Sequence, residues 1–281
     1  MLFRMTIQAP AKVNLTLRIL TKRSDGYHNI ESLIVPITLA DEMDVAIAGG
    51  NEIRLSCDDP AIPGGPENLA WRAADAFRKS TGQKISITID IRKNIPQGAG
   101  LGGGSSDAAA VIRALNQLCK TGLSESRMED IAGTLGSDVP FFIRCQPSRC
   151  SGRGEVITPV GDIPPADLFL IKPPFPVSTA WAYQNWKQGA PCAQQTWKNL
   201  AFANDLEEPV FQKYLLCPVI KNWLLDQKEV AAAQMSGSGS TLFAVLQADG
   251  VALAQRARER FGKTVWTAQA KTLNAFKQNE L

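Results

Sequence analysis

Five glycines between positions 96 and 106 form the most informative chemical feature of the sequence. The segment consists of Pro96, Gln97, Gly98, Ala99, Gly100, Leu101, Gly102, Gly103, Gly104, Ser105 and Ser106. Glycine tolerates positive φ and lets backbone amides approach a ligand without an intervening Cβ atom. A helical pattern follows this segment, and the backbone amide groups at a helix N-terminus bind anions. The segment therefore predicts a phosphate-binding loop whose serine hydroxyls could donate hydrogen bonds or reach a magnesium ion.

Two common phosphate-binding loops do not account for this segment. Three of its glycines fit the spacing of the dinucleotide-binding pattern, and an acid, Glu125, follows roughly twenty residues later. In that fold the acid ends a second parallel strand, whereas residues 121–135 have the pattern of a turn and a helix. A Walker loop requires lysine where this chain has Ser105. A tight turn without a ligand is the remaining alternative, and the conformational entropy of five glycines argues against it.

A second glycine-rich segment lies between two apolar stretches near the C-terminus. It reads Met235-Ser236-Gly237-Ser238-Gly239-Ser240-Thr241. This segment is either a simple hairpin loop or a second loop that closes on the phosphates held by the first. Both interpretations stay open at the level of sequence.

Lys12 and Asp138 are candidate catalytic side chains. Asp138 either caps a short helix that begins at Pro140 or acts as a base. Lys12 lies in an alternating segment, residues 6–20, where it is either solvated or catalytic. A lysine next to an aspartate beside the γ-phosphate of ATP would orient and activate a hydroxyl for phosphoryl transfer. Sequence spacing does not bring the two together.

The single histidine, His28, limits the chemistry that the chain can perform. A zinc site or a Ser-His-Asp triad would have to use this one residue, so catalysis should depend on carboxylates, lysines and backbone amides. Tyr27 and His28 follow a predicted turn at residues 24–26. They either recognise a nucleobase by stacking and hydrogen bonding or cover a hairpin.

The composition points to a globular protein with a small-molecule partner. The chain has 281 residues, and 30 basic against 27 acidic side chains give a formal charge of +3. This charge is too small and scattered for a nucleic-acid groove or a polybasic membrane patch. The six cysteines form no CxxC pair and indicate reduced thiols. Residues 1–20 lack a signal-peptide core and a transmembrane run, so we expect a cytoplasmic location.

Hydrophobic periodicity predicts two sets of mixed helices and strands. In the first set we expect strands at 6–20, 30–37 and 84–92, and helices at 68–80, from Ser105 or Ser106 onward, and at 125–135 with Gly136 as its cap. A segment rich in proline and glycine, residues 152–165, is the expected crossing between domains. In the second set we expect strands at 168–172, 230–235, 241–246 and 263–268, and helices at 179–186, 210–225 and 251–261.

Four motifs, in order, resemble those of the galactokinase, homoserine, mevalonate and phosphomevalonate kinase (GHMP) superfamily. The first glycine segment resembles its phosphate loop, residues 9–15 its first motif, residues 136–142 its acidic motif and residues 236–240 its third motif. Residues 25–28, 102–106 and 204–207 are most similar to one branch. That branch phosphorylates the 2-hydroxyl of a cytidine diphosphate-linked methylerythritol in the non-mevalonate isoprenoid pathway. The resemblance implies a kinase that uses ATP and magnesium on this small molecule.

The resemblance also assigns roles to individual residues. Asp138 would take the hydroxyl proton, and Lys12 would hold Asp138 and the developing charge. Asn14 would line the same pocket, while Tyr27, His28 and, as a second stacking ring, Tyr183 would recognise cytosine. Gly237, Ser238 and Gly239 would lie on the substrate side. ATP would be surrounded by Asn68, Lys93 and the glycine segment from Pro96 to Ser106, with Ser106 suggested as a magnesium ligand.

The superfamily has an α+β fold of two domains, which sets the expected architecture. Residues 1–155 would form an ATP-binding domain similar to part of a ribosomal protein, and residues 156–281 a ferredoxin-like domain whose last residues pack back on the first. We expect no nucleic-acid or membrane partner and either a monomer or a homodimer. A mevalonate or homoserine kinase is disfavoured by Tyr27 and His28, which suit a nucleobase. A nucleotide-binding regulator without turnover is disfavoured by the presence of both Lys12 and Asp138.

Overall fold

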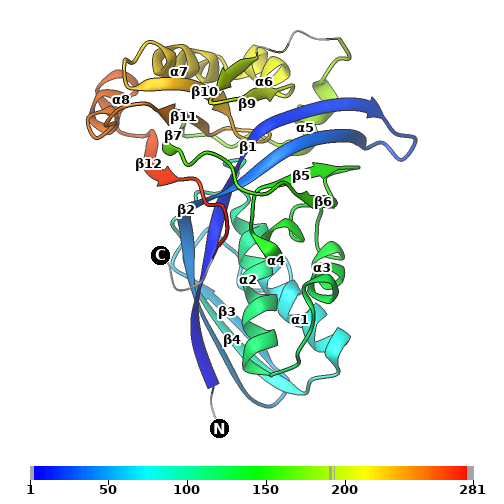
Figure 1. Ribbon diagram of the computed structural model, residues 1–281. Coiled ribbons are helices and arrows are strands. Elements are labelled where there is room, and N and C mark those ends of the chain that lie inside the picture. Colours follow the sequence, from blue (N-terminus) through cyan, green and yellow to red (C-terminus); the bar gives the residue numbers. More distant parts are fainter. Residues whose placement is uncertain (1–2, 190–191, 193, 277–281) are drawn as a thin grey trace.

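The chain folds into two sheets with helices on their outer faces (Figure 1). The computed structural model describes residues 3–189, 192 and 194–276. The strands of the first sheet are β1 (Phe3–Lys22), β2 (His28–Gly49), β3 (Ile53–Cys57), β4 (Ile85–Arg92), β5 (Ser148–Ser151), β6 (Val156–Pro159), β8 (Gln195–Trp197) and β9 (Leu200–Asn204). Those of the second are β7 (Asp167–Lys172), β10 (Val230–Met235), β11 (Leu242–Leu246) and β12 (Trp266–Lys271).

Helices accompany both sheets, as an α+β fold requires. They are α1 (Leu69–Thr81), α2 (Gly103–Leu118), α3 (Glu125–Gly133), α4 (Phe141–Arg144), α5 (Thr179–Asn185), α6 (Glu207–Lys213), α7 (Leu216–Leu225) and α8 (Leu253–Phe261). The first sheet has the strand order β3-β4-β2-β1-β9-β8 with β5 and β6 attached through β2, and the second has the order β10-β11-β7-β12. None of the described helices is long and apolar enough to cross a membrane.

The long hairpin of β1 and β2 is the central element of the first sheet, and Figure 1 shows it running along most of the molecule. The alternation along β1 places Val13 and Leu15 in the core between the two sheets, but Lys12 and Asn14 are buried as well, so this part of the strand is covered on both faces and is not half-buried as expected. Lys12 and Asn14 share the other face, and the register with β2 shifts beside each of them. Such irregularities redirect side chains locally. The strand therefore presents two polar groups together on one face.

The glycine segment leads directly into α2, as expected for a strand, glycine loop and helix. The helix begins at Gly103, two or three residues before the expected start at Ser105 or Ser106, because Gly102 adopts a left-handed conformation with φ of 76° and forms the N-cap. The apolar face of the helix is fully buried at Ala108, Val111 and Leu115. This packing, against α1 and the first sheet, fixes the helix N-terminus beside the loop.

Two expected helix boundaries were wrong. Helix α3 ends at Gly133 rather than at a Gly136 cap, because the Thr134 hydroxyl donates to the carbonyl oxygen of Ile131 at 2.7 Å and closes the last turn. The expected helix at 210–225 is divided into α6 and α7. Tyr214 leaves the helical region, and Pro218, which has no N–H group, is accommodated in the first turn of α7.

The chain crosses between the sheets more than once. Strands β5 and β6 pair with each other and belong to the first sheet, so residue 155 lies in the turn of that hairpin. After β7 the chain returns through β9, which pairs in parallel with β1. At the far end, the amide of Leu273 donates to Pro36 and that of Phe276 to Cys145. Residues 277–281, expected to pack on the first domain, lie outside the described residues, and the division at 155 stays a prediction.

Candidate active site

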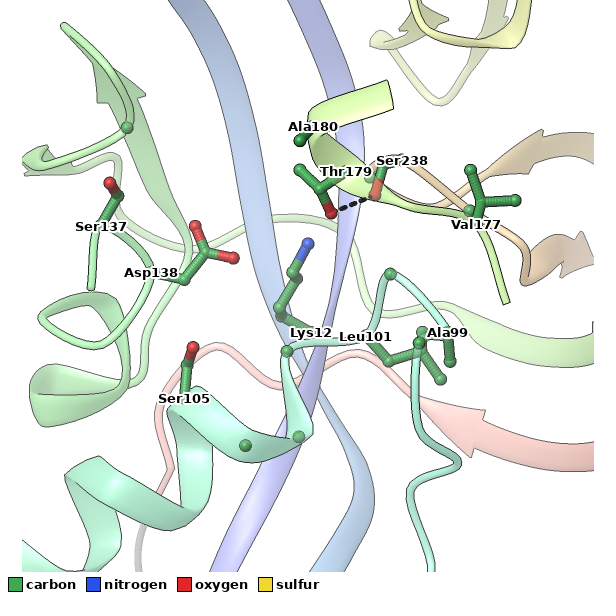
Figure 2. A pocket seen from close by; sticks show the side chains of 18 of the residues that line it. Lys12, Ala99, Leu101, Ser105, Ser137, Asp138, Val177, Thr179, Ala180 and Ser238 are labelled. Carbon is green, nitrogen blue, oxygen red and sulfur yellow. Dashed lines mark hydrogen bonds between the residues drawn. The ribbon is translucent and has the colours of Figure 1, made fainter. Parts of the chain in front are cut away.

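A cavity of about 910 Å³ lies where the two glycine segments, β1 and α5 meet. Its volume is suited to a nucleotide and a second small molecule. The described lining includes every predicted site residue except Ser106: Lys12, Asn14, Tyr27, His28, Asn68, Lys93, Asp138, Tyr183, residues 96–105 and residues 237–239. Figure 2 shows part of this lining around Lys12.

Lys12 and Asp138, 126 positions apart in the sequence, face each other across the cavity. In Figure 2 the amine of Lys12 and the carboxylate of Asp138 both point into the open space above the glycine loop. Asp138 lies on an exposed turn before α4, and no side chain caps that helix. The capping role considered for Asp138 therefore finds no support in the helix geometry. Lys12 is only 5% exposed, which argues against a solvated side chain.

The buried ammonium group of Lys12 is held in place by Asn14. Lys12 Nζ donates to Asn14 Oδ1 at 2.6 Å, and Asn14 Nδ2 donates to Ser32 Oγ at 2.8 Å. Burial lowers the pKa of Lys12 below its ordinary value, while the charge of Asp138 acts in the opposite direction. Asp138 also contributes, after burial, to the raised pKa of the Tyr183 phenol. The lysine, the aspartate and the tyrosine thus share one electrostatic environment.

The first glycine segment requires glycine at alternate positions. Gly98, Gly100 and Gly102 all have positive φ, between 58° and 76°. A Cβ atom on Gly100 would collide with the carbonyl oxygen of Ser236, and one on Gly102 would lie 2.7 Å from the Phe142 ring. The amide of Lys12 donates to the carbonyl oxygen of Leu101 at 3.0 Å, so this loop is joined directly to β1.

The second glycine segment is both a hairpin loop and a wall of the cavity. It connects the antiparallel strands β10 and β11. Ser236 Oγ donates to the carbonyl oxygen of Gly100 at 2.9 Å, and the amide of Thr241 donates to Ala99 at 3.2 Å. The two glycine segments therefore pack against each other beside Lys12, from opposite sheets.

Aromatic rings form the other end of the cavity. The His28 ring is stacked on Tyr183 with centroids 5.8 Å apart, and the edge of Trp186 approaches it at 5.7 Å. Burial lowers the pKa of His28, and the charge of Lys22 acts in the same direction, which favours a neutral ring with one donor and one acceptor. Tyr27 is more than half exposed and lies under the guanidinium group of Arg153, 5.0 Å from its centroid.

Lys93 lies at the opposite end, between two buried carboxylates. It forms ion pairs with Asp41 and, at 2.8 Å, with Asp107. Burial alone would lower the pKa of Lys93, but the two carboxylates raise it above its ordinary value. Burial raises the pKa of Asp107 to about 7. Asn68 caps α1 by accepting from the amide of Ala70 at 2.9 Å, so it fixes the start of a helix at the rim of the cavity.

The suggested magnesium role of Ser106 finds no support in the geometry. Its side chain is fully buried and donates to the carbonyl oxygen of Pro10 at 2.7 Å, outside the cavity. Ser105 is the serine that lines the cavity. Over the described residues, no group of three or more His, Cys, Asp or Glu side chains could hold a metal ion.

Several lining residues were missed by sequence reasoning. Arg153, Thr179 and Ser137 line the cavity, and Trp186 packs on His28. The spacing of Thr179, Tyr183 and Trp186 by four and three residues is that of one helical face, which was a usable signal. Arg153 carried no signal, because its loop approaches Tyr27 only in the folded sheet.

Comparison with known proteins agrees with this arrangement. Residues 68–146 match the family model described as the GHMP kinases N terminal domain. The chain is 40% identical over 276 residues to the 4-diphosphocytidyl-2-C-methyl-D-erythritol kinase of Geobacter sulfurreducens, covering 95% of this chain and 98% of that protein. A crystal structure of 4-(cytidine 5'-diphospho)-2C-methyl-D-erythritol kinase superposes with a TM-score of 0.81 and 32% identity, covering 95% of this chain and 99% of the other.

A more distant structure shares the fold alone. Homoserine kinase from Cytophaga hutchinsonii superposes with a TM-score of 0.68 at 16% identity, covering 97% of this chain and 95% of the other. The identity is much higher, over nearly whole chains, to the kinases named for the cytidine compound. The chain belongs to the 4-diphosphocytidyl-2-C-methyl-D-erythritol kinase family of the GHMP kinases.

Proposed function

We propose that this kinase transfers the γ-phosphate of ATP to the 2-hydroxyl of 4-diphosphocytidyl-2-C-methyl-D-erythritol, giving the 2-phosphate and ADP. The observation that carries the proposal is the order of groups along one cavity. Along the β1–β2 hairpin, His28 pairs with Lys22 at the hairpin end, Lys12 pairs with Pro36, and Asp41, the ion-pair partner of Lys93, pairs with Ala9. The aromatic wall of His28 and Tyr183 therefore lies towards one end of the cavity and Lys93 towards the other, with Lys12 between them. A cytidine at the aromatic end and ATP at the other end would meet at the lysine and the aspartate.

The transfer step uses groups of this chain for positioning and charge stabilisation. The oxygen of the substrate hydroxyl bonds to the γ-phosphorus while Asp138 accepts the hydroxyl proton. At the same time the bond between that phosphorus and the bridging oxygen of ADP breaks. The ammonium group of Lys12 stabilises the negative charge that develops on the transferring group. Amides of the glycine segment, at the N-terminus of the 16-residue helix α2, hold the phosphates of ATP.

At the aromatic end, a neutral His28 offers one hydrogen-bond donor and one acceptor to the polar edge of cytosine. Tyr183 and Tyr27 supply flat apolar surface of the kind on which a base stacks. Neither feature is needed to bind a small carboxylic acid. This end of the cavity therefore favours the cytidine compound over mevalonate or homoserine.

Magnesium would enter with ATP. The chain offers no cluster of carboxylates for a resident ion among the described residues, and Mg²⁺ is commonly held by substrate phosphates and water with few protein ligands. Ser105 is the cavity-lining hydroxyl nearest in sequence to the start of α2, and it would be available to such a complex. When bound, the ion neutralises phosphate charge.

The test is ADP release in the presence of magnesium and ATP, with 4-diphosphocytidyl-2-C-methyl-D-erythritol, mevalonate and homoserine compared at equal concentrations. Turnover on the cytidine compound alone supports both the reaction and the substrate. Turnover on another alcohol would retain the kinase and reject the base-binding role of His28 and Tyr183. No ADP release with any of the three alcohols would reject the proposal.

A further inference from the structure

Three buried polar side chains hold the second glycine segment from behind, outside the cavity. Asn204 at the end of β9 is 1% exposed, and Glu207 and Lys221 are each 7% exposed. Not one of the three lines the described cavity. The mechanism above leaves them without a role.

Asn204 is hydrogen-bonded through its whole amide group. Nδ2 donates to the carbonyl oxygens of Met235 and Gly237, both at 2.8 Å. Oδ1 accepts from the amide of Leu206 at 2.9 Å, which fixes the orientation of the amide. One side chain therefore connects both ends of the turn Met235-Ser236-Gly237 to the end of β9.

Glu207 holds the same turn at its first residue. Its Oε1 accepts from the amide of Met235 at 2.9 Å, and its Oε2 accepts from Lys221 Nζ at 2.6 Å. A buried ion pair of this kind adds little net stability compared with an apolar replacement of the same volume. Burial raises the pKa of Glu207, and Lys221 and the Met235 amide act in the opposite direction. The two hydrogen bonds hold the carboxyl group in one orientation, so the geometry of the pair suits positioning better than stabilisation.

The opposite side of this turn faces the reacting groups. A Cβ atom on Gly237 would lie 3.2 Å from both Lys12 Nζ and the carbonyl oxygen of Gly100, and 3.3 Å from Asn14 Oδ1. There is thus no spare space between the turn and the lysine. A shift of the turn by about 1 Å would either displace Lys12 or open the wall beside it, and displacements of this size can cost about 100-fold in rate.

We infer that Asn204 and the Glu207–Lys221 pair are positioning residues for phosphoryl transfer, acting through the turn at residues 235–237 on Lys12 and the wall beside it. Asp205 anchors the same segment to β1, because its Oδ2 accepts from the amide of Ile19 at 2.7 Å. The cluster therefore connects the strand that carries Lys12 to the loop that packs on it. This inference rests on the proposed function.

The test compares Asn204→Asp and Asn204→Ala with a matched control, Asn116→Ala. Asn204→Asp keeps the size of the side chain and loses both donors. Asn116 also bonds the backbone, donating to Leu123 at 3.1 Å and accepting from its amide at 2.9 Å, but outside the cavity. Steady-state ADP release would be measured at a temperature well below the unfolding midpoint of each variant. The concentrations of the alcohol and of ATP would be varied separately.

We expect kcat/KM for the alcohol to fall about 10- to 100-fold in both Asn204 variants, with KM for ATP changed less than about threefold. Asn116→Ala should lose stability and keep both constants per folded molecule. Wild-type constants in folded Asn204 variants would overturn the inference. If neither Asn204 variant folds, Glu207→Gln and Glu207→Ala are compared instead. Glutamine keeps an acceptor for the Met235 amide, so Glu207→Gln should retain more of kcat/KM for the alcohol than Glu207→Ala. Equal kcat/KM values for the two Glu207 variants would reject the inference.

The outcome is separable from that of the proposed function. A wild-type chain that turns over a different alcohol would be tested with that alcohol, and the same ratios would decide the positioning role. A wild-type chain that turns over none of the three alcohols would remove both proposals.

Discussion

Replacement of Asp138 by asparagine would remove one carboxylate charge and change almost nothing else. The side chain lies on an exposed turn, and it has no hydrogen bond or ion pair within the part of the chain that the structure describes. It does not cap α4, whose start carries no side-chain hydrogen bond. We therefore expect the free energy of unfolding to change by less than about 0.5 kcal/mol.

The loss of activity should be large by comparison. Removal of a general base costs about 100- to 10,000-fold in turnover, which is about 3–5 kcal/mol of activation free energy. A second effect follows from Lys12, because the charge of Asp138 raises its pKa against the effect of burial. Without that charge the pKa of Lys12 falls further. The alkaline limb of the residual activity should therefore move to lower pH.

The assay is ADP release at saturating substrate from pH 6 to 10, with ATP binding measured by calorimetry and stability by urea unfolding. Asp162→Asn is the matched control, because Asp162 is an exposed carboxylate outside the cavity. Turnover within about threefold of wild type would refute the role of Asp138 as the base. A parallel loss of ATP binding would instead assign Asp138 to the nucleotide.

Three further outcomes are expected. Lys12→Met should reduce turnover at least about 100-fold. The pKa of Lys12 is lower in the folded than in the unfolded state, so the free energy of unfolding of the wild type, measured with urea, should rise with pH between these two pKa values. The variant should lack this rise. His28→Ala should raise KM for the cytidine compound at least about tenfold and leave KM for ATP unchanged, and an equal rise in both would contradict base recognition. Gly100→Ala should lower the free energy of unfolding by about 1–2 kcal/mol because of its φ of 73°, and it should abolish activity because the new Cβ atom collides with Ser236. The control Gly122→Ala, with φ of 65° in open space, should lose a similar amount of stability and keep full activity.

Local pattern was sufficient to predict the elements whose burial is periodic. α1 and β4 were predicted within one residue of their observed bounds, because their apolar positions repeat at the period of a helix or a strand. β10 was predicted at its observed bounds from a short, continuous apolar run that begins at Val230, and it is buried at every position except Ala231. The glycine segment was recognisable because its requirement for positive φ is local to each residue. The phosphate-binding role of the glycine segment could therefore be proposed before any fold was known, whereas the roles of Asn68 and Lys93 followed from the family resemblance.

Contacts between distant segments could not be predicted in this way. β2 extends to Gly49, twelve residues beyond its expected end, because pairing with β1 and, from Glu42 onward, with β4 continues the strand through the polar residues Asp41, Glu42 and Asp44. Asp41 itself is buried only because it accepts from the amides of Asn94 and Ile95 and pairs with Lys93. Such partners lie more than 50 positions away, where periodicity carries no information.

The arrangement of the cavity separates the chemistry of the reaction from the choice of substrate. Lys12 and the two glycine segments are joined by backbone hydrogen bonds and close contacts across the interface of the two sheets, where a side chain on Gly100 would collide. That part of the site has little freedom to change without loss of the fold. The aromatic wall comes instead from the hairpin end at His28 and from α5, whose Thr179 hydroxyl is hydrogen-bonded at 2.8 Å to the hydroxyl of Ser238 in the second glycine segment. Substrate choice within this architecture should therefore follow the hairpin end and α5. Exchanging those two elements should alter which alcohol binds while Lys12 and Asp138 keep their roles.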